Sequence, residues 1–345
     1  MPERLAPLHL AAYQEHEPLV LGAPRAARAG HALVGRLTLG ADAWLGAGSI
    51  VRADGHYVRI GEQFHLGRGA TVHIAQDRYP TVIHERVSVG ANAVAHACAL
   101  LADVVIEEDC VVLDGSVVGA GAVLQAGSVV FPRSRLAAGM LHGGAPARPL
   151  RALAPGEAAA RAAALRARNE AADARWPGRA RAASAAAGTF VADTARLVGA
   201  VHLAAGASIW YGCRLDARRG AITLGARCNV QDNSVLAAGA AGLPIGADTT
   251  IGHNVRLEDC TVGARCLVGI GSRIARGTVI ADDTFVAAGT HTTPGQRLEG
   301  GRLWGGQPAR PIGMLDEAKR AVVLETAAMY AGYACAMRGA GRRSG

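Results

Sequence analysis

Residues 104–130 read VVIEEDCVVLDGSVVGAGAVLQAGSVV, and apolar residues recur along this stretch about every six positions, commonly followed by Gly or Ala. The same period runs through residues 31–141 and 197–299. A six-residue period predicts a parallel β-helix, in which three short strands make one triangular coil and successive coils pair along their edges. Small aliphatic residues fill such a core, which fits a chain with 50% apolar but only 4% aromatic residues.

The chain contains this pattern twice. LVGRLTLG at 33–40 corresponds to LVGAVHLA at 197–204, and GGAPARP at 143–149 corresponds to GGQPARP at 305–311. One constant offset aligns the halves as far as His73, and a slightly smaller offset aligns them beyond the loop that follows it. The two halves are therefore a tandem duplication.

Helix signals follow each half. An Ala- and Arg-rich stretch begins near Pro155 and stops at Pro177, and residues 314–337 read as a second helix. A helix of about 20 residues spans roughly 30 Å, the height of about six coils, so it can return the chain to the start of a second β-helix beside the first. We expect an all-β solenoid of two tandem hexapeptide-repeat β-helix domains, side by side, each followed by an α-helix.

The expected boundaries follow from these signals. Residues 1–150 form the first β-helix domain with an N-terminal extension, and 151–189 a helical linker. Residues 190–313 form the second β-helix domain, and 314–345 a C-terminal helix and basic tail.

Composition limits the classes of function. The net charge of +8 resides mainly in the linker and the tail, which disfavours nucleic-acid binding by a folded basic face. The seven Cys form no CxxC pair and suit reduced thiols. We find no signal peptide and no uncharged apolar run long enough for a membrane-spanning helix, so we expect a cytoplasmic protein that does not bind membranes.

Motifs in the second half carry a family resemblance: NVQDNS at 229–234, IGHNVRLEDC at 251–260 and LWGGQPARP at 303–311. With them the chain resembles the γ-class carbonic anhydrases and their relatives of the phenylacetate and carnitine operons, whose β-helices are left-handed. The resemblance covers nearly all of 190–337 and, more weakly, 31–155. In that family three His, contributed by two neighbouring subunits, bind zinc or iron at the seam between β-helices.

The resemblance divides these ligands between the two halves. The first half matches the family's first and third ligands, and the second half matches only the middle one. The matching residues are His73, His96 and His253, and the positions without His are Ala91, Ala237 and Glu258. This implies one three-His site between the two domains, for Zn²⁺ or alternatively Fe²⁺ or Co²⁺. The competing interpretation is that both halves are decaying copies with scattered surviving histidines.

The resemblance also implies residues that orient the metal-bound water. Asn229 and Gln231 match them in the second half, whereas the first half has His65 and Gly67. The catalytic assignment is therefore Gln231 and Asn229, on the same half as His253.

The family's Arg-x-Asp, which ties neighbouring subunits together, matches Arg52 and Asp54 in the first half. In the second half the order is reversed to Asp216 and Arg218, and the sequence leaves open how these charges pair.

Other polar residues have simpler interpretations. The acidic turn at 107–109 is expected to be solvated, and Cys98 and Cys260 are expected to be small core residues rather than ligands. His84 and Glu85 are candidates for moving protons to solvent, but a polar surface loop explains them equally well.

The resemblance implies reversible CO₂ hydration. Three neutral imidazoles suit this reaction, because they leave the metal's charge available to ionise bound water. Three alternatives stay open. The same site could hydrolyse, hydrate or decarboxylate a larger carbonyl compound or thioester, the chain could be a CoA-dependent acyltransferase, or it could be a non-catalytic scaffold subunit. The expected partners are a small-molecule substrate, CO₂ or bicarbonate or a carbonyl compound, and further copies of the chain in a homo-oligomer.

Overall fold

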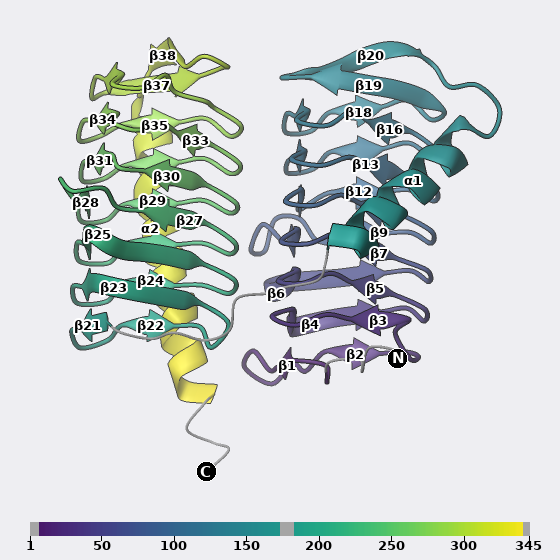
Figure 1. Cartoon of the computed structure of the whole chain (residues 1–345), viewed down its shortest axis with the longest axis horizontal. Coiled ribbons are helices and arrows are strands. Elements are labelled where there is room, and N and C mark those ends of the chain that lie inside the picture. The colour runs from purple at the N-terminus through teal and green to yellow at the C-terminus, as the bar shows by residue number, and fades with distance from the viewer. Residues whose placement is uncertain (1–6, 173–182, 341–345) are drawn as a thin grey trace. The chain divides into compact units, whose positions relative to one another are not determined.

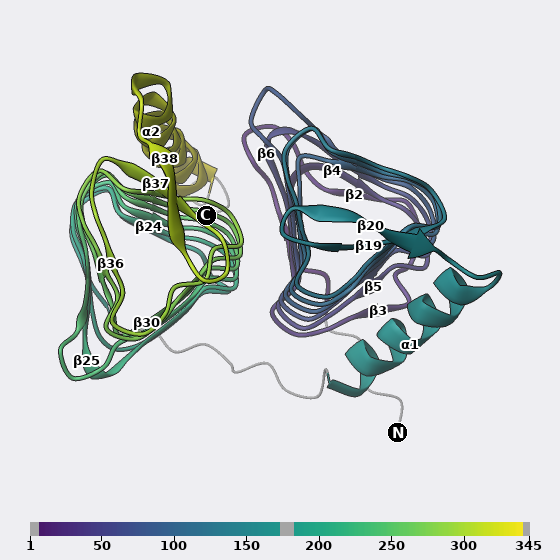
Figure 2. The same ribbon diagram turned by 90° about the horizontal axis from the view of Figure 1, so that it is seen from above.

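A computed structural model describes residues 7–172 and 183–340. The chain divides into two compact units, Met1–Pro177 and Gly178–Gly345, and each contains a parallel β-helix followed by one α-helix (Figure 1). Viewed from above, the coils of each unit trace a triangle (Figure 2). The solenoid and the two helices that the sequence predicts are thereby confirmed.

Unit 1 wraps two faces of its triangle with one continuous sheet, because the long strand β6 turns a corner and pairs with strands on both sides. The 12 strands are β1 (Leu10–Ala11), β2 (Leu19–Val20), β4 (Ala32–Leu39), β6 (Ile50–Ile60), β8 (Thr71–His73), β9 (Thr81–Ile83), β11 (Val94–His96), β12 (Ala99–Leu100), β14 (Val111–Val112), β15 (Val117–Val118), β17 (Val129–Val130) and β18 (Arg135–Leu136). The N-terminal extension contributes β1 and β2, which pair with β4.

The third face of unit 1 is a sheet of eight strands that ends in an antiparallel hairpin. It contains β3 (Ala26–Ala27), β5 (Trp44–Leu45), β7 (His65–Leu66), β10 (Ser88–Val89), β13 (Val105–Ile106), β16 (Val123–Leu124), β19 (Met140–Gly144) and β20 (Ala147–Ala152). Leu66, Val89, Ile106 and Leu124 stand in register on successive strands and are fully buried. This aliphatic column is the core that the six-residue period predicts.

Unit 2 repeats the arrangement with β25 at the corner. Its larger sheet has ten strands: β21 (Ala183–Ala185), β23 (Arg196–Leu203), β25 (Arg214–Leu224), β27 (Val235–Ala237), β28 (Leu243–Ile245), β30 (Arg256–Glu258), β31 (Thr261–Val262), β33 (Arg273–Ile274), β34 (Val279–Ile280) and β36 (Arg297–Leu298). Its third face has eight: β22 (Phe190–Val191), β24 (Ser208–Ile209), β26 (Asn229–Val230), β29 (Thr250–Ile251), β32 (Leu267–Val268), β35 (Phe285–Val286), β37 (Arg302–Gly305) and β38 (Arg310–Met314).

One glycine in each unit is required by the close approach of two coils. Gly35 has φ +79°, and a Cβ atom there would lie 2.3 Å from the carbonyl oxygen of Ala53. Gly199, its counterpart in unit 2, has φ +82° and meets the carbonyl oxygen of Ala217 at the same distance. Only glycine fits both the backbone conformation and the space.

Helix α1 (Glu157–Ala172) packs on the eight-stranded face of unit 1. Its Leu165 is fully buried against Val105, Val123 and Leu141. The helix predicted from Pro155 to Pro177 thus exists, and the part of the predicted stretch beyond residue 172 lies outside the described residues.

The solvated acidic turn that the sequence predicts at 107–109 is wrong for two of its residues. Arg161 of α1 donates to Glu107 at 2.8 Å, and Arg168 donates to Glu108 at 3.0 Å. The sequence could not reveal this, because both cations belong to α1 and lie far from the turn along the chain. The turn is part of the surface on which α1 rests.

Helix α2 (Glu317–Ala340) occupies the corresponding face of unit 2, against β22, β24, β26 and β29. It begins and ends three residues later than the predicted 314–337. The rings of Tyr330 and Tyr333 lie edge-on to Trp210, with centroids 5.3 and 6.4 Å away. Neither helix, within the described residues, is long and apolar enough to cross a membrane.

Candidate metal centre

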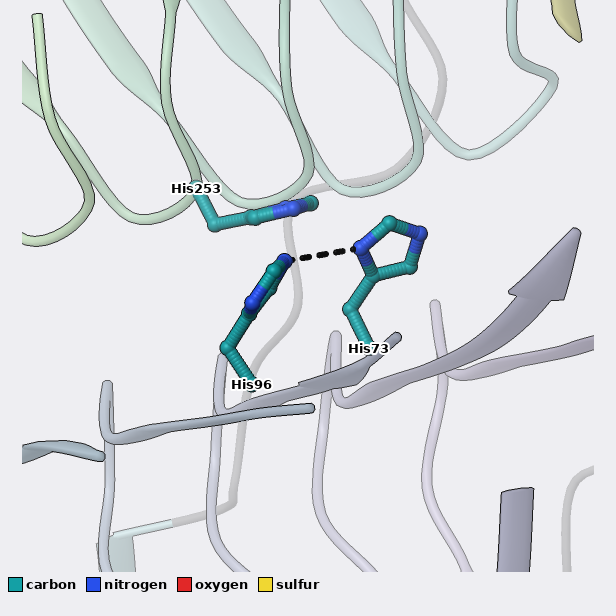
Figure 3. Close-up of side chains that lie close together, drawn as sticks. All are labelled: His73, His96 and His253. Carbon is teal, nitrogen blue, oxygen red and sulfur yellow. Dashed lines mark hydrogen bonds between the residues drawn. The ribbon is translucent and has the colours of Figure 1, made fainter. Parts of the chain in front are cut away.

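Unit 1 brings His73 and His96 together on one face. They end strands β8 and β11, which pair in parallel with these two residues in register. Nδ1 of His73 lies 3.3 Å from Nε2 of His96, the contact drawn as a dashed line in Figure 3. The 23-residue separation in sequence is one coil enlarged by the loop after His73, which explains how the β-helix juxtaposes the two rings.

A carboxylate anchors the far nitrogen of each ring. Oδ1 of Asp54 lies 2.9 Å from Nε2 of His73, and Oδ1 of Asp114 lies 2.6 Å from Nδ1 of His96. An ionised carboxylate only accepts hydrogen bonds, so the proton of each neutral imidazole resides on the anchored nitrogen. Each facing nitrogen then carries a lone pair.

With both rings neutral and anchored in this way, the two facing nitrogens, 3.3 Å apart, need a cation between them, which is either a proton shared as a hydrogen bond or a metal ion. A metal ion satisfies both, and carboxylates that hold the outer nitrogens of ligand imidazoles are a regular feature of protein metal sites. The donor set of unit 1 therefore fits two ligands of a zinc-type ion. Asp114 did not emerge from the sequence, although its position one coil after His96 is a signal that could have found it.

Asp54 is itself held in place, because Arg52 donates to its other carboxylate oxygen, Oδ2. The Arg-x-Asp motif of the first half thus forms a pair within unit 1 and continues to His73. In unit 2 the reversed Asp216 and Arg218 also pair with each other, with Nε of Arg218 donating to Oδ1 of Asp216 at 2.9 Å. This answers how the reversed charges pair.

The third candidate ligand follows β29 in unit 2. Nδ1 of His253 lies 3.2 Å from Oδ2 of Asp232, whose Oδ1 accepts from the backbone N–H of Tyr211 at 3.0 Å. On the other side of the ring, the hydroxyl of Tyr330 lies 3.3 Å from Nε2 of His253. Tyr330 comes from α2, far along the chain, and no local signal marks it.

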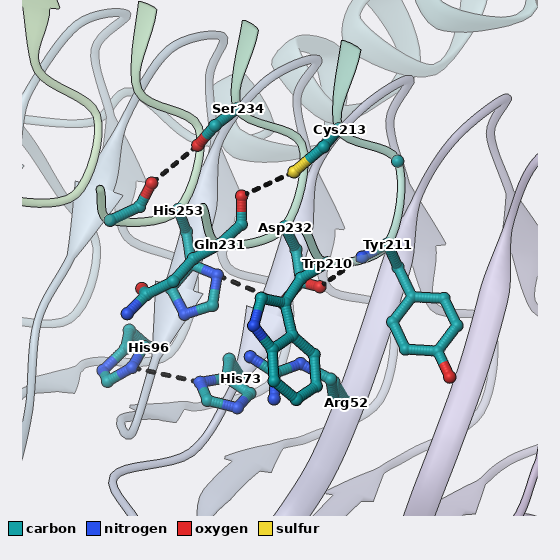
Figure 4. A network of polar contacts seen from close by, with 12 residues as sticks. Arg52, His73, His96, Trp210, Tyr211, Cys213, Gln231, Asp232, Ser234 and His253 are labelled. Atoms are coloured by element: carbon teal, nitrogen blue, oxygen red, sulfur yellow. Dashed lines mark hydrogen bonds and ion pairs between the residues drawn. The ribbon is translucent and has the colours of Figure 1, made fainter. Parts of the chain in front are cut away.

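Asn229 and Gln231 stand beside His253 in unit 2. Asn229 lies on β26 and donates from Nδ2 to the hydroxyl of Thr250 at 2.8 Å. Nε2 of Gln231 is 3.3 Å from Oδ1 of Asn229, so the two amides form a chain. Figure 4 shows Gln231 and Asp232 with His253. It also shows the thiol of Cys213, which donates to the backbone carbonyl oxygen of Gln231 at 3.0 Å.

The side chains on successive coils of one face differ between the two units. In unit 1 this column of side chains is Arg52, His73, His96 and Asp114. At the corresponding positions unit 2 has, in order, Asp216, Ala237, Glu258 and Arg276. Nη2 of Arg276 donates to Glu258 at 2.9 Å, so the charges at both ends of the column are reversed and the pairing is kept. A column with Ala in the centre and its carboxylate engaged by a guanidinium lacks the donors for a metal.

The other polar residues that the sequence singled out are Cys98, Cys260, His84 and Glu85. Cys98 and Cys260 are buried, and burial raises the pKa of both thiols, that of Cys260 to about 12, so neither is a thiolate at neutral pH. Glu85 lies 3.4 Å from Arg86 in an exposed ion pair. His84 follows β9 and is joined to Leu100 through its backbone N–H.

The curated relatives match this chain over about two fifths of its length. No family model matches the chain. Over 152 residues, 42% of this chain, it is 35% identical to "Gamma carbonic anhydrase 1, mitochondrial" of Arabidopsis thaliana, and the match spans only 55% of that relative, about half its length. Over 149 residues it is 37% identical to protein YrdA of Escherichia coli, covering 41% of this chain and 81% of YrdA.

Among solved structures, a protein of Desulfovibrio desulfuricans G20, provisionally assigned as an acetyltransferase, superposes on 86% of this chain and 70% of its own with a TM-score of 0.56. The identity is 14%, so this likeness supports the β-solenoid fold and nothing finer.

Proposed function

Because the chain belongs to the γ-carbonic anhydrase-like family of hexapeptide-repeat β-helix proteins, we propose that it is a metal-dependent enzyme that hydrates CO₂ reversibly. We infer that His73 and His96 of unit 1 and His253 of unit 2 hold one ion together, because these three residues complete the family's ligand set. The ion is zinc, with ferrous iron and cobalt as alternatives, since three imidazoles suit all of these metals.

The single observation that carries the proposal is the imidazole pair of unit 1. Both rings have their outer nitrogens anchored by carboxylates, and both direct a lone pair to the same point. This arrangement suits a metal ion, because both facing nitrogens can bind it and neither ring can turn without breaking its anchor. Two protein ligands alone bind zinc weakly, and three are the usual number at a catalytic centre.

His253 supplies the missing ligand because it is the family's middle ligand on the half that has lost the other two. Asp232 and Tyr330 flank its ring within unit 2, so the imidazole is held rather than free to rotate. Because Ala237 and Glu258 replace the two histidines in unit 2, the described residues hold the family's ligands for one ion and not for two.

The bound ion supplies a Lewis acid that lets water ionise near neutral pH. The chain's own residues do the rest. Gln231 and Asn229 form a chain of amides whose donors and acceptors orient water before the reaction and the bicarbonate oxygens after it. Asp54 and Asp114 keep the protons of His73 and His96 on the outer nitrogens.

Metal content is the decisive first measurement. The full chain, purified without added metal and then reconstituted separately with zinc, cobalt and anaerobic ferrous iron, is analysed by plasma mass spectrometry. We expect about one ion per chain in the wild type and in His202→Ala, a matched control at an exposed His of unit 2. His73→Ala and His253→Ala both lose the ion although they lie in different units. An ion retained in His253→Ala contradicts the proposal that both units supply ligands. No ion in the wild type contradicts the proposal that the protein is a metal-dependent enzyme.

The substrate is tested on the loaded protein. CO₂ hydration is followed by stopped flow, and hydrolysis of acyl-CoA thioesters is followed in parallel. Hydration that disappears with the ion supports the proposal. Thioester or other carbonyl turnover without CO₂ hydration assigns the same centre to a larger substrate. Retention of acyl-CoA with no metal dependence favours the acyltransferase. If the protein shows no activity and binds no ligand, the non-catalytic scaffold is favoured.

A further inference from the structure

A small cavity lies in unit 1 beneath helix α1, away from the histidine pair. Its volume is about 180 Å³, and it is lined by Arg25, Asp42, Gln63, Phe64, His65 and Arg166. This is room for several water molecules or one small ion. All lining residues belong to unit 1, and none of them takes part in the proposed metal centre.

His65 provides a buried donor at this cavity. Its ring is 1% exposed and stacks on Trp44 with centroids 4.2 Å apart. Burial, together with the charges of Arg166 and Arg25, lowers the pKa of His65 to about 3, so the imidazole is neutral at physiological pH. Nδ2 of Asn169 on α1 donates to Nε2 of His65 at 3.0 Å, which places the ring proton on Nδ1.

That proton has no acceptor among the described residues, since Nδ1 of His65 is buried and makes no hydrogen bond. A buried donor without a partner is rare in native proteins and indicates a missing water or ligand. The observation therefore points to an acceptor that belongs in the cavity.

Two guanidinium groups line the same cavity. Arg166 is oriented by donating from Nε to the hydroxyl of Ser88 at 2.9 Å, and Arg25 by donating to Glu170 at 2.8 Å. Burial and the nearby charge of Arg25 lower the pKa of Arg166, while the charges of Glu170, Asp103 and Asp42 act in the opposite direction. Nη2 of Arg166 also donates to the backbone carbonyl oxygen of Arg86 at 3.2 Å. The charges of both guanidiniums act on His65, and a cavity lined by two guanidiniums and an imidazole N–H favours an acceptor with negative charge.

Asp42 narrows the class of anion. It is exposed, it lines the cavity, and its charge acts on Arg166. A fully deprotonated oxyanion would place an oxygen lone pair against this carboxylate. An oxyanion that keeps one proton can instead donate to Asp42 while its other oxygens accept from Arg25, Arg166 and His65.

We propose that this cavity binds a small oxyanion that carries a proton, of which bicarbonate is the smallest common example. Bicarbonate is also the product of the proposed reaction. The fraction of cavities that are occupied, and with it the contacts of Arg166 on α1, would therefore depend on the product concentration. The binding itself does not rest on the metal centre, because its residues and the histidine pair are disjoint.

Three residues that line the cavity in unit 1 have no charged or imidazole counterpart in unit 2. At the corresponding positions of the duplication, Asn229 replaces His65, Thr189 replaces Arg25 and Gly206 replaces Asp42. Asn229 donates to the hydroxyl of Thr250, and neither Thr189 nor Gly206 carries a charge. The charged lining is therefore found only at the unit 1 positions of these three pairs.

Calorimetric titration of the full chain with bicarbonate and with nitrate tests the proposal. Nitrate matches bicarbonate in shape and charge and has no proton. The titrations use the wild type without metal and the double variant His73→Ala/His96→Ala, which lacks the proposed metal ligands. We expect one bicarbonate per chain in both proteins, and nitrate binding weaker by about tenfold or more.

Variants identify the site. Arg25→Gln and Arg166→Gln are expected to raise the bicarbonate dissociation constant by about tenfold or more, because each removes a charged donor. Arg168→Gln, on the same helix but paired with Glu108, leaves it unchanged. Asp42→Asn removes the preference for bicarbonate over nitrate.

Three results overturn the proposal: no saturable binding to the wild type, loss of binding in the double variant, or equal effects of Arg25→Gln and Arg168→Gln. Equal affinity for nitrate and bicarbonate in the wild type overturns the role of the anion's proton. Because Arg25 is exposed, its replacement tests the site without disturbing the core. Failure here leaves the metal proposal intact, since metal content is measured separately.

Discussion

Oδ1 of Asp114 lies 2.6 Å from Nδ1 of His96, on the coil that follows the histidine. The bond fixes the imidazole proton on Nδ1 and leaves Nε2 to face His73. Asp114 is thus a positioning residue for one candidate metal ligand, and it belongs to the same unit as that ligand.

Asp114→Asn is expected to weaken metal binding by about tenfold, the lower end of the effect of removing such a partner. The dissociation constant is measured by competition with a chelator of known affinity, so activity does not enter. Asp103→Asn, which loses a surface pair with Arg86, is the control. Unchanged affinity in Asp114→Asn would show that His96 is oriented by its coil alone.

Leu165→Ala tests how α1 is attached to unit 1. The side chain is fully buried against Val105, Val123 and Leu141, so its loss is expected to cost about 2–5 kcal/mol of unfolding free energy. Urea unfolding measures the change. Leu150→Ala removes an equal side chain that is 54% exposed, and it is expected to change the free energy by less than about 1 kcal/mol.

Gly35→Ala tests the contact between coils. Gly121 also has a positive φ, of 62°, but a Cβ there meets nothing within 4 Å. Gly121→Ala is therefore expected to cost about 1–2 kcal/mol, from backbone conformation alone. Gly35→Ala adds a collision with the Ala53 carbonyl oxygen and is expected to cost about 4 kcal/mol or more. Equal melting temperatures for the two variants would contradict the close approach.

The buried His65 predicts a dependence of stability on pH. Its pKa is about 3 in the folded chain and about 6.5 when unfolded, so the unfolded state binds one more proton between these values. Unfolding free energy is therefore expected to fall as pH decreases from about 6.5 towards 3, by up to about 1.4 kcal/mol per pH unit from this group.

Denaturant unfolding at pH 7 and pH 4, in chloride buffers without oxyanions, measures this loss in the wild type and in His65→Asn. Asparagine is the residue that unit 2 carries at the matching position. The wild type should lose more stability on acidification than the variant. Parallel losses would show that His65 is already charged in the folded chain.

The coils could be predicted from the sequence because their signal is local. Every strand in 104–130 carries its own apolar residue and its own turn. The first coil is different: β1 and β2 have no six-residue period and exist because β4 offers them an edge to pair with. Such pairing is visible only once the neighbouring strand has been placed.

The candidate site divides in the same way. The resemblance singled out His73 and His96, and the register of β8 and β11 brings them together. Asp114 follows His96 by one coil, so the repeat can place it, whereas Tyr330 reaches His253 from α2 and no local pattern predicts it. The ion pairs of Glu107 and Glu108 could not be predicted from the sequence either, because their partners lie on α1, far along the chain.

The reversed column of unit 2 bears on the history of the duplication. A carboxylate-anchored histidine pair like that of unit 1 would need Ala237 and Glu258 to become histidines and Arg276 to become an acid. Any one of these changes alone gains no ligand pair, and replacing Arg276 first would set an acid beside Glu258. Selection acting on single mutations therefore has no favourable first step, and the loss of the second centre is, for practical purposes, evolutionarily irreversible.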